Sequence, residues 1–507
     1  MGEKMIFASI KRLAKHSAVY GIGYIISRFM AFLLLPLYTH FLSREEMGVT
    51  TIMFTYLAIF TILYTYGLNS AFLRFYIMEE SEQGKKRIFS TAFLTSLISS
   101  FCFSAVLYVA AAPAAALLFS AESHATGAPL TTIVRYGAAI LFCDSLAILP
   151  FLVLRAEERS GRFVLFKSFN VVSNIVLNVV LVALMGRKVE GVFLANVISS
   201  ALTLAVLMPL VLSRMRLTYS RSDLRELLAF GLPYMPSTLS VVILDTIDRP
   251  LLERLAGVDV AGLFGAGARI AIVMNLLVSA FSFAWHPFFL STVKEENAKE
   301  IFSKVLTYLL VVCCSVFLVV SLLVDHLVRL RLGGFTLFEE KFWDCTAVVP
   351  VLMLAYIPYA AHVNFLIGIY LEKKTGYLPL STGLGMAGNL AANFLLIPAM
   401  GMMGAAWARV IAYTIMALVL YPIGQRLYPV PYEFGRIAKL AVVVAAVFFA
   451  GTKVHAPWPF LYHLLLLALF PVLLKLVGFF DTRELAKLRS LLGGARRVMP
   501  RAGEPVG

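Results

Sequence analysis

The sequence predicts an all-α polytopic membrane protein of about 14 transmembrane helices. Two parallel six-helix repeats are expected around a central cavity, followed by two extra C-terminal helices. The 507 residues are 60% hydrophobic and only 14% charged, and the mean hydropathy is +0.85, which is too apolar for a soluble chain. The apolar residues gather in long runs between short basic segments, and patterns from the first half of the chain return in the second.

Fourteen apolar runs are long enough to cross the roughly 30 Å hydrocarbon core of a bilayer as helices. They lie at 17–42, 49–71, 90–119, 130–153, 165–185, 191–212, 227–249, 261–290, 303–325, 344–371, 378–400, 402–424, 437–455 and 457–478. The run at 90–119 contains Pro113, and only a short turn separates the last two runs. Twelve helices are therefore the alternative.

The basic residues predict how the chain is oriented. Most loop lysines and arginines fall on one side if both termini are cytoplasmic, which is the positive-inside pattern. The net charge of +15 is spread over many segments, so we expect membrane lipids and no nucleic acid as partners.

An internal repeat divides the chain into two lobes. Asn174, Asn178 and Gly186 match Asn389, Asn393 and Gly401 at one constant offset, while Glu45 and Gly48 recur as Asp259 and Gly262. Six spans separate equivalent positions, so the repeats are parallel and the substrate path should lie between them, unless the repeat survives only for packing. The predicted divisions are a cytoplasmic N-terminus (1–16), an N-terminal lobe (17–226), a C-terminal lobe (227–436), helices 13 and 14 (437–478) and a basic cytoplasmic tail (479–507).

Three stretches carry a family resemblance. They are YGIGYIISRFMAFLLLPLYTHFLSREEMGV from Tyr20, YGLNSAFLRFY at 66–76 and DTIDRPLLERLAGVDVAGLFGAGARI at 245–270. They resemble bacterial oligosaccharide flippases of the Wzx type, in the multidrug/oligosaccharidyl-lipid/polysaccharide (MOP) exporter superfamily. Lipid II flippases are relatives that share Ser27-Arg28 but carry an Arg-Asp pair where this chain has Leu34-Leu35, which argues against lipid II as the cargo.

The resemblance implies a function in the bacterial cytoplasmic (inner) membrane. The expected cargo is undecaprenyl-diphosphate-linked oligosaccharide for O-antigen, capsule or exopolysaccharide biosynthesis, moved by alternating access coupled to an ion gradient. Polysaccharide polymerase and chain-length machinery are the implied partners. A multidrug/cation antiporter of the same superfamily and a lipid II flippase are the alternatives.

Arginines inside the spans are candidates for binding the diphosphate, because a guanidinium stays charged and can grip two oxygens at once. Arg28 lies near the middle of the first span and is the deepest, with a structural salt bridge as the alternative. Arg269 corresponds to a cavity arginine of the relatives. Arg409 lies among small residues that suit either a cavity or close helix packing. Arg135 and Arg249 fall near helix ends, where they are expected to snorkel.

Acidic residues inside the spans are candidates for ion coupling. Asp144 has no cation nearby in the sequence and is the isolated candidate. Asp245 and Asp248 share a helix face, and Arg249 follows Asp245 at salt-bridge spacing. They predict either an ion-pair cluster that closes the outer end or a gate that binds a proton or sodium.

Asparagines form the third candidate group. Asn69, Asn178 and Asn393 either line the path and bond sugar hydroxyls or join helices within each lobe.

The sequence offers no chemistry for a reaction. It has no phosphate-binding Gly-Lys-Ser/Thr loop, nucleophile motif or metal-ligand spacing, so we expect no enzyme, no cofactor and no metal. A polymerase or membrane glycosyltransferase would need a larger loop domain than this chain has.

Overall fold

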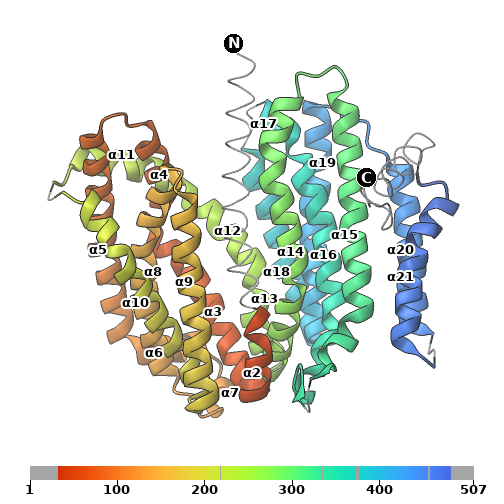
Figure 1. Ribbon diagram of the computed structural model, residues 1–507, viewed down its shortest axis with the longest axis horizontal. Coiled ribbons are helices and arrows are strands. Elements are labelled where there is room, and N and C mark those ends of the chain that lie inside the picture. Colours follow the sequence, from red (N-terminus) through yellow and green to blue (C-terminus); the bar gives the residue numbers. More distant parts are fainter. Residues whose placement is uncertain are drawn as a thin grey trace, which may run out of the picture. The chain divides into compact units, whose positions relative to one another are not determined.

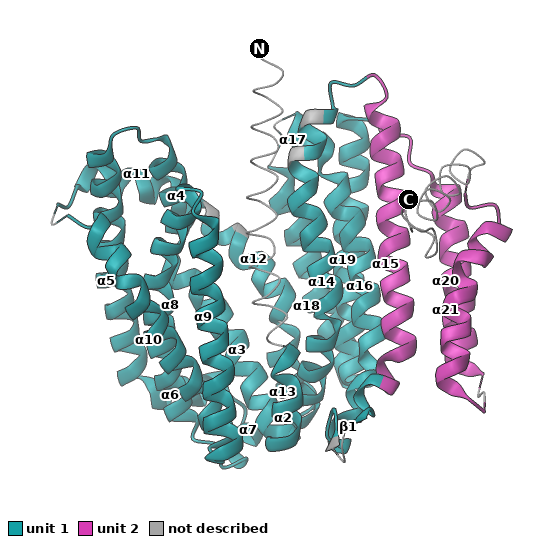
Figure 2. Ribbon diagram, in the orientation of Figure 1, with its two compact units in different colours: residues 1–295, 327–429 teal, residues 296–326, 430–507 magenta. Residues whose placement is uncertain are grey.

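The computed structural model describes residues 32–480, except for residues 217, 333–334, 373, 375 and 455–456. The chain forms two compact units, coloured separately in Figure 2. The first combines Met1–Glu295 with Leu327–Pro429, and the second combines Glu296–His326 with Val430–Gly507. The predicted site residue Arg28 lies outside the described residues.

Within the described residues, twelve helices are long and apolar enough to cross a membrane, so the chain is a multi-pass membrane protein. They are α3 (Arg44–Thr65), α5 (Glu82–Val109), α8 (Leu130–Ala156), α9 (Ser160–Asn178) with the π-helix η1 (Val179–Leu184), α10 (Lys188–Arg214), α14 (Val258–Thr292), α15 (Ala298–Val328), η3 (Glu340–Val348) with α16 (Val349–Phe365) and α17 (Ile367–Leu371), α18 (Tyr377–Met400), α19 (Met402–Leu427), α20 (Phe434–Lys453) and α21 (Pro459–Leu476).

Shorter elements connect these helices (Figure 1). They are α2 (Leu35–Phe41), α4 (Leu68–Met78), α6 (Ala111–Leu118), α7 (Ala121–Ala125), α11 (Arg221–Gly231), η2 (Leu232–Tyr234), α12 (Met235–Thr246), α13 (Asp248–Ala256) and the antiparallel two-residue strands β1 (Arg331–Leu332) and β2 (Phe335–Thr336).

Twelve of the predicted runs are confirmed as long helices. The run at 17–42 lies largely outside the described residues, and the run at 227–249 is divided among α11, η2, α12 and α13. Prolines explain the division, because Pro236 cannot donate a hydrogen bond to Leu232 and Pro250 cannot donate one to Thr246. The chain accordingly forms a short 3-10 helix at η2, and the α-helix is interrupted at Ile247.

The sequence repeat returns as repeated geometry. The Asn178 amide donates to the backbone oxygen and Oδ1 of Asn174, at 2.8 and 3.1 Å. The Asn393 amide makes the same two contacts with Asn389, both at 2.9 Å. Gly186 and Gly401, which follow these pairs, both have positive φ, at 66° and 55°. The two lobes therefore share local structure, while their exact boundaries stay a prediction.

The repeats meet where α3 crosses α14. A Cβ at Gly48 would lie 2.0 Å from the Val258 carbonyl oxygen, and one at Gly262 would lie 2.0 Å from the Arg44 carbonyl oxygen. These contacts are equivalent, because Gly48 and Arg44 correspond in the repeat to Gly262 and Val258. Only glycine allows the two backbones to approach this closely.

The predicted outer segments gather at one end of the first unit, which we call the Gly257 end (bottom in Figure 1). Arg44 pairs with Asp344 at 2.8 Å, and Lys188 pairs with Glu46 at 3.0 Å. Three predicted inner segments of this unit, 73–89, 155–167 and 213–226, meet at the opposite end, which we call the Asp223 end. There Arg87 pairs with Asp223 at 2.7 Å.

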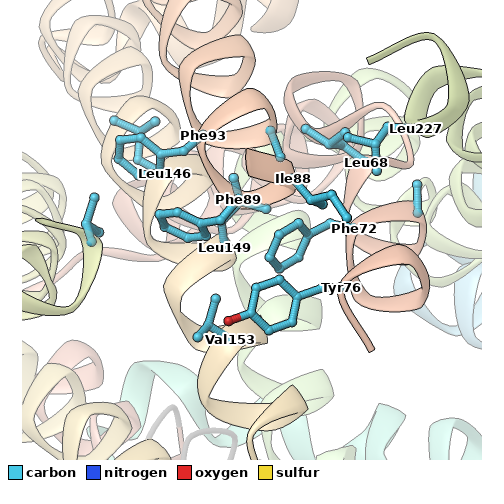
Figure 3. Close-up of a cluster of buried hydrophobic side chains, with 13 residues drawn as sticks. Leu68, Phe72, Tyr76, Ile88, Phe89, Phe93, Leu146, Leu149, Val153 and Leu227 are labelled. Atoms are coloured by element: carbon cyan, nitrogen blue, oxygen red, sulfur yellow. The ribbon is translucent and has the colours of Figure 1, made fainter. Parts of the chain in front are cut away.

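An apolar core joins α4, α5 and α8 near the Asp223 end (Figure 3). Phe72 and Phe89 are fully buried, with ring centroids 6.1 Å apart. Tyr76 packs on Phe72 and donates a hydrogen bond of 2.9 Å to Glu157, which also pairs with Arg214 at 2.7 Å. This core fixes the helices that carry one wall of the cavity described below.

The second unit consists of α15, α20 and α21. Thr307 on α15 donates a 2.7 Å hydrogen bond to Glu433, just before α20. His326 and His463 join α15 to α21 through ring nitrogens 3.0 Å apart. Because of such contacts, α15 belongs to the same compact unit as the two C-terminal helices.

Candidate functional site

A cavity of about 510 Å³ lies inside the first unit. Its walls come from α2, α3, α8, α9, α10, α13 and α14. Four charged side chains line it: Asp144, Lys167, Arg249 and Arg269. The lining described here thus holds three cations and one carboxylate, which favours an anion.

Arg269 of α14 lines the cavity, at the kind of position that the family resemblance implies. We call the side of the cavity formed by α13 and α14 the first wall. The guanidinium carbon of Arg269 is 5.4 Å from the centroid of the Tyr38 ring, and one of the guanidinium nitrogens is 3.1 Å from the Met47 sulfur. Arg269 forms no ion pair with any carboxylate in the described part of the chain. A charged, pre-positioned guanidinium with free donors suits a phosphate or carboxylate ligand.

Arg249 of α13 shares this wall, which sequence reasoning missed. It was expected to snorkel at a helix end, yet it lines the cavity and donates a 3.4 Å hydrogen bond to Thr55. The break at Ile247 separates it from Asp245, and the Asp248 carboxylate is engaged by Arg409. The proline at position 250 was the available signal that the helix would not continue regularly.

Asp144 of α8 and Lys167 of α9 line another side of the cavity, formed by α8, α9 and α10, which we call the second wall. Ser200 of α10 lines the same part of the cavity, and the Lys167 ammonium attracts the Asp144 carboxylate. The Lys167 ammonium also lies 4.3 Å from the centroid of the Phe151 ring. Asp144 therefore lies in the cavity but has a cation that its sequence neighbours did not reveal.

Neutral polar groups of α9 and α10 complete the second wall. The Asn170 amide donates to Thr203 at 2.8 Å, and the Asn174 amide donates to Ser199 at 3.2 Å. The Asn196 amide donates to the Val192 carbonyl at 3.0 Å. The Oδ1 atoms of Asn170 and Asn196 receive no hydrogen bond from the described residues, so they present acceptors.

The spacing of this polar stripe was visible in the sequence. Lys167, Asn170 and Asn174 follow one another at three and four residues, which places them on one face of α9. Lys167 lies only two residues inside the apolar run at 165–185, so the sequence does not single it out as a cavity residue.

The predicted asparagines lie elsewhere. Asn178 is buried and accepts a 2.9 Å hydrogen bond from the Tyr38 hydroxyl, joining α9 to α2. Asn393 is buried against Asn389. Asn69 is partly exposed at the start of α4 and does not line the cavity. Asn178 thus joins two helices, which is one of the two alternatives that the sequence leaves open, whereas the hydrogen bonds of Asn393 in the described structure stay within α18.

Arg409, Asp245 and Asp248 come together outside the cavity. Arg409 pairs with the fully buried Asp248 carboxylate and donates a 3.0 Å hydrogen bond to the Asp245 backbone oxygen. The Tyr413 hydroxyl donates to the Asp245 carboxylate. This cluster joins α19 to the broken helix at α12 and α13.

Polar contacts hold the Gly257 end together. The buried Glu253 carboxylate accepts hydrogen bonds from the Ser120 backbone amide, at 2.8 Å, and from the Ser123 hydroxyl. The Val258 backbone amide donates to Glu122 at 3.2 Å. These contacts fasten α7 of the first repeat to α13 and α14 of the second.

Comparisons with known proteins agree with this architecture. The sequence model of a family described as polysaccharide biosynthesis protein matches residues 13–293. No curated protein sequence matches the chain. Among solved structures, the chain is similar to the lipid II flippase MurJ in an inward closed conformation, with a TM-score of 0.73 and 14% identity over 91% of this chain and 99% of that chain.

Two conformations of a multidrug resistance MATE family transporter of the MOP superfamily are also similar. The inward-facing form has a TM-score of 0.64 and 15% identity over 79% of this chain and 94% of that chain. The outward-facing form has a TM-score of 0.56 and 17% identity over 83% of this chain and 97% of that chain. At these identities the likeness establishes a shared fold.

Proposed function

Because this chain belongs to the polysaccharide biosynthesis protein family, we propose that it flips undecaprenyl-diphosphate-linked oligosaccharide across the bacterial cytoplasmic membrane. The observation that carries the proposal is the cavity lining, with three cations against one carboxylate. An anionic headgroup needs such a cationic, water-accessible passage through the apolar part of the bilayer, whereas the polyprenyl tail can stay in the lipid.

The two walls suit the two parts of the headgroup. Arg249 and Arg269 project from α13 and α14 and would bind the diphosphate, since guanidinium–phosphate contacts are charge-assisted and can be bidentate. The acceptor oxygens of Asn170 and Asn196 on the opposite wall would receive hydrogen bonds from sugar hydroxyls. Arg28 is predicted to add a further positive charge to the diphosphate site formed by Arg249 and Arg269.

Alternating access would proceed between the lobes at 17–226 and 227–436. We assign the Gly257 end to the outer face, with both termini cytoplasmic, because the basic segments gather at the Asp223 end. Release to the outer leaflet would then require Glu253 to leave Ser120 and Ser123.

Asp144 is the preferred site of ion coupling. A coupling carboxylate must exchange its proton or ion with water as the protein changes conformation. Asp144 lines the cavity, whereas Asp248 is fully buried in its ion pair with Arg409. Asp245 and Asp248 are therefore assigned to holding the broken helix.

The cavity charge separates this function from the alternatives. A multidrug/cation antiporter would favour a cavity rich in carboxylates, and the three cations argue against it. Lipid II shares the diphosphate, so the cargo must be identified directly. Deleting the gene should remove one surface glycan, whether O-antigen, capsule or exopolysaccharide, and accumulate its lipid-linked unit. Loss of peptidoglycan synthesis would instead identify lipid II as the cargo, and unchanged glycans with loss of drug resistance would favour the antiporter.

A further inference from the structure

The short helix α11 presents a basic and apolar face outside the cavity. Arg221 and Arg225 are exposed and line a groove of about 650 Å³ with Leu224, Leu228 and Leu232. These positions lie on one face of the helix because they recur at three- and four-residue intervals. Leu232 is 47% exposed, and Tyr219 at the edge of the groove is 49% exposed.

The opposite face of α11 is committed to the first unit. Leu227 is buried, and the Phe230 ring meets Phe75 of α4 with centroids 6.1 Å apart. Asp223 pairs with Arg87 of α5 at 2.7 Å. These contacts fix the rotation of α11, so its basic face must point away from the protein.

The guanidinium groups of Arg221 and Arg225 form no ion pair with a carboxylate of the described residues. The Asp223 carboxylate on the same helix pairs with Arg87. Residues four apart on a helix lie about one turn apart, close enough for both guanidinium groups to reach one phosphate.

The groove also lies where a bilayer surface is expected. The helix α11 follows directly after the spanning helix α10, which ends at Arg214. A helix that presents leucines and arginines at this level can place its apolar side chains among acyl chains and its arginines among headgroups.

We propose that this groove binds one anionic phospholipid of the surrounding leaflet. Its phosphate lies between Arg221 and Arg225, and one acyl chain covers Leu224, Leu228 and Leu232. The lipid pins α11 to the membrane surface and so fixes the start of the broken helix that carries Arg249. This site is separate from the cargo cavity and does not depend on the identity of the cargo.

Native mass spectrometry of the full-length protein tests the proposal. The delipidated protein is titrated with phosphatidylglycerol and, separately, with phosphatidylcholine of the same acyl chains. The wild type should retain one tightly bound phosphatidylglycerol. Arg221→Gln/Arg225→Gln should weaken that binding by roughly thirtyfold, because each arginine near a membrane surface contributes about a factor of five.

Arg155→Gln/Arg162→Gln is the matched control. It removes two exposed positive charges that do not line the groove, and should leave the bound lipid in place. Arg221→Lys/Arg225→Lys keeps the charge and should retain most of the affinity, which guards against misfolding of the glutamine variant. Equal loss in the control pair, equal retention of phosphatidylcholine, or unchanged binding in Arg221→Gln/Arg225→Gln would overturn the proposal. If a protein occupies the groove instead, the glutamine variant keeps its lipid and loses only that partner.

Discussion

Arg409 of α19 and Asp248 of α13 form an ion pair that is almost completely buried, with exposed fractions of 4% and 0%. It ties the broken helix to α19 within the second repeat. Asp248→Ala should therefore lower the free energy of unfolding by about 3–5 kcal/mol, because it leaves a buried guanidinium unpaired. Thermal unfolding in detergent measures this loss.

Two further variants sharpen that prediction. Asp344→Asn breaks the exposed pair with Arg44 and should cost less than about 1 kcal/mol. Asp248→Leu/Arg409→Met replaces the buried pair with apolar groups and should recover most of the stability. If the double variant were as unstable as Asp248→Ala, the loss could not be explained by an unpaired buried charge alone.

Variants of Asp144 and Lys167 can distinguish a role of Asp144 in ion-coupled transport from a role in balancing the charge of Lys167. Asp144→Asn should weaken the dependence of transport on an ion gradient, since the variant side chain cannot exchange a proton or hold a cation. Asp144→Asn/Lys167→Met removes both charges, so it should not restore that dependence. Transport into vesicles with and without a gradient gives the comparison. If the double variant regained ion dependence, Asp144 would not be the coupling site, and its role would be only to balance the charge of Lys167.

Glu253 should act as a latch at the Gly257 end. Glu253→Ala removes the acceptor for Ser120 and Ser123, so the cavity should open more often toward that end. A cysteine introduced at the cavity residue Thr61, with Cys102 replaced by serine, should then react several times faster with a membrane-impermeant thiol reagent. Glu339→Ala is the control, because it removes another acidic side chain at the same end, a partly exposed one that pairs with His40 at 3.6 Å. Equal rates in both variants would rule out the latch.

The sidedness of the molecule can be tested at two exposed positions in helices at its two ends. His124 lies in α7 at the Gly257 end, and Arg162 lies near the start of α9 at the opposite end. In intact cells with a permeabilised outer membrane, His124→Cys should be labelled by an impermeant reagent and Arg162→Cys should be protected. The reverse pattern would invert the proposed topology.

The sequence was sufficient for the helices, the repeat and part of the site. Apolar runs located the spans because a bilayer imposes a length on each helix. The matching Asn-Asn pairs show which positions are equivalent. Asp144 is a cavity candidate because buried charge inside a span needs a wet or paired environment, and Arg269 is one because it corresponds to a cavity arginine of the family that the chain resembles.

The remaining site residues depended on tertiary structure. Arg249 reaches the cavity only because the helix breaks at Ile247 and Asp248 turns to Arg409, a partner 161 residues away in the chain. Lys167 has the polar stripe of α9 as its signal, but only the packing of α8 on α9 brings it to Asp144. The buried environment of Arg409 likewise follows from partners on another helix.

Flipping by the purified protein is the most direct test of the central claim, that Arg249 and Arg269 bind the diphosphate of a lipid-linked cargo. Vesicles containing the full-length protein and a fluorescent polyprenyl-diphosphate oligosaccharide report the fraction of cargo in each leaflet. Arg249→Gln/Arg269→Gln should slow equilibration at least about tenfold, because each charge-assisted hydrogen bond contributes roughly 1.5–3 kcal/mol. Arg135→Gln, an exposed arginine outside the cavity, should flip at the wild-type rate. Wild-type flipping by a folded Arg249→Gln/Arg269→Gln variant would contradict the account.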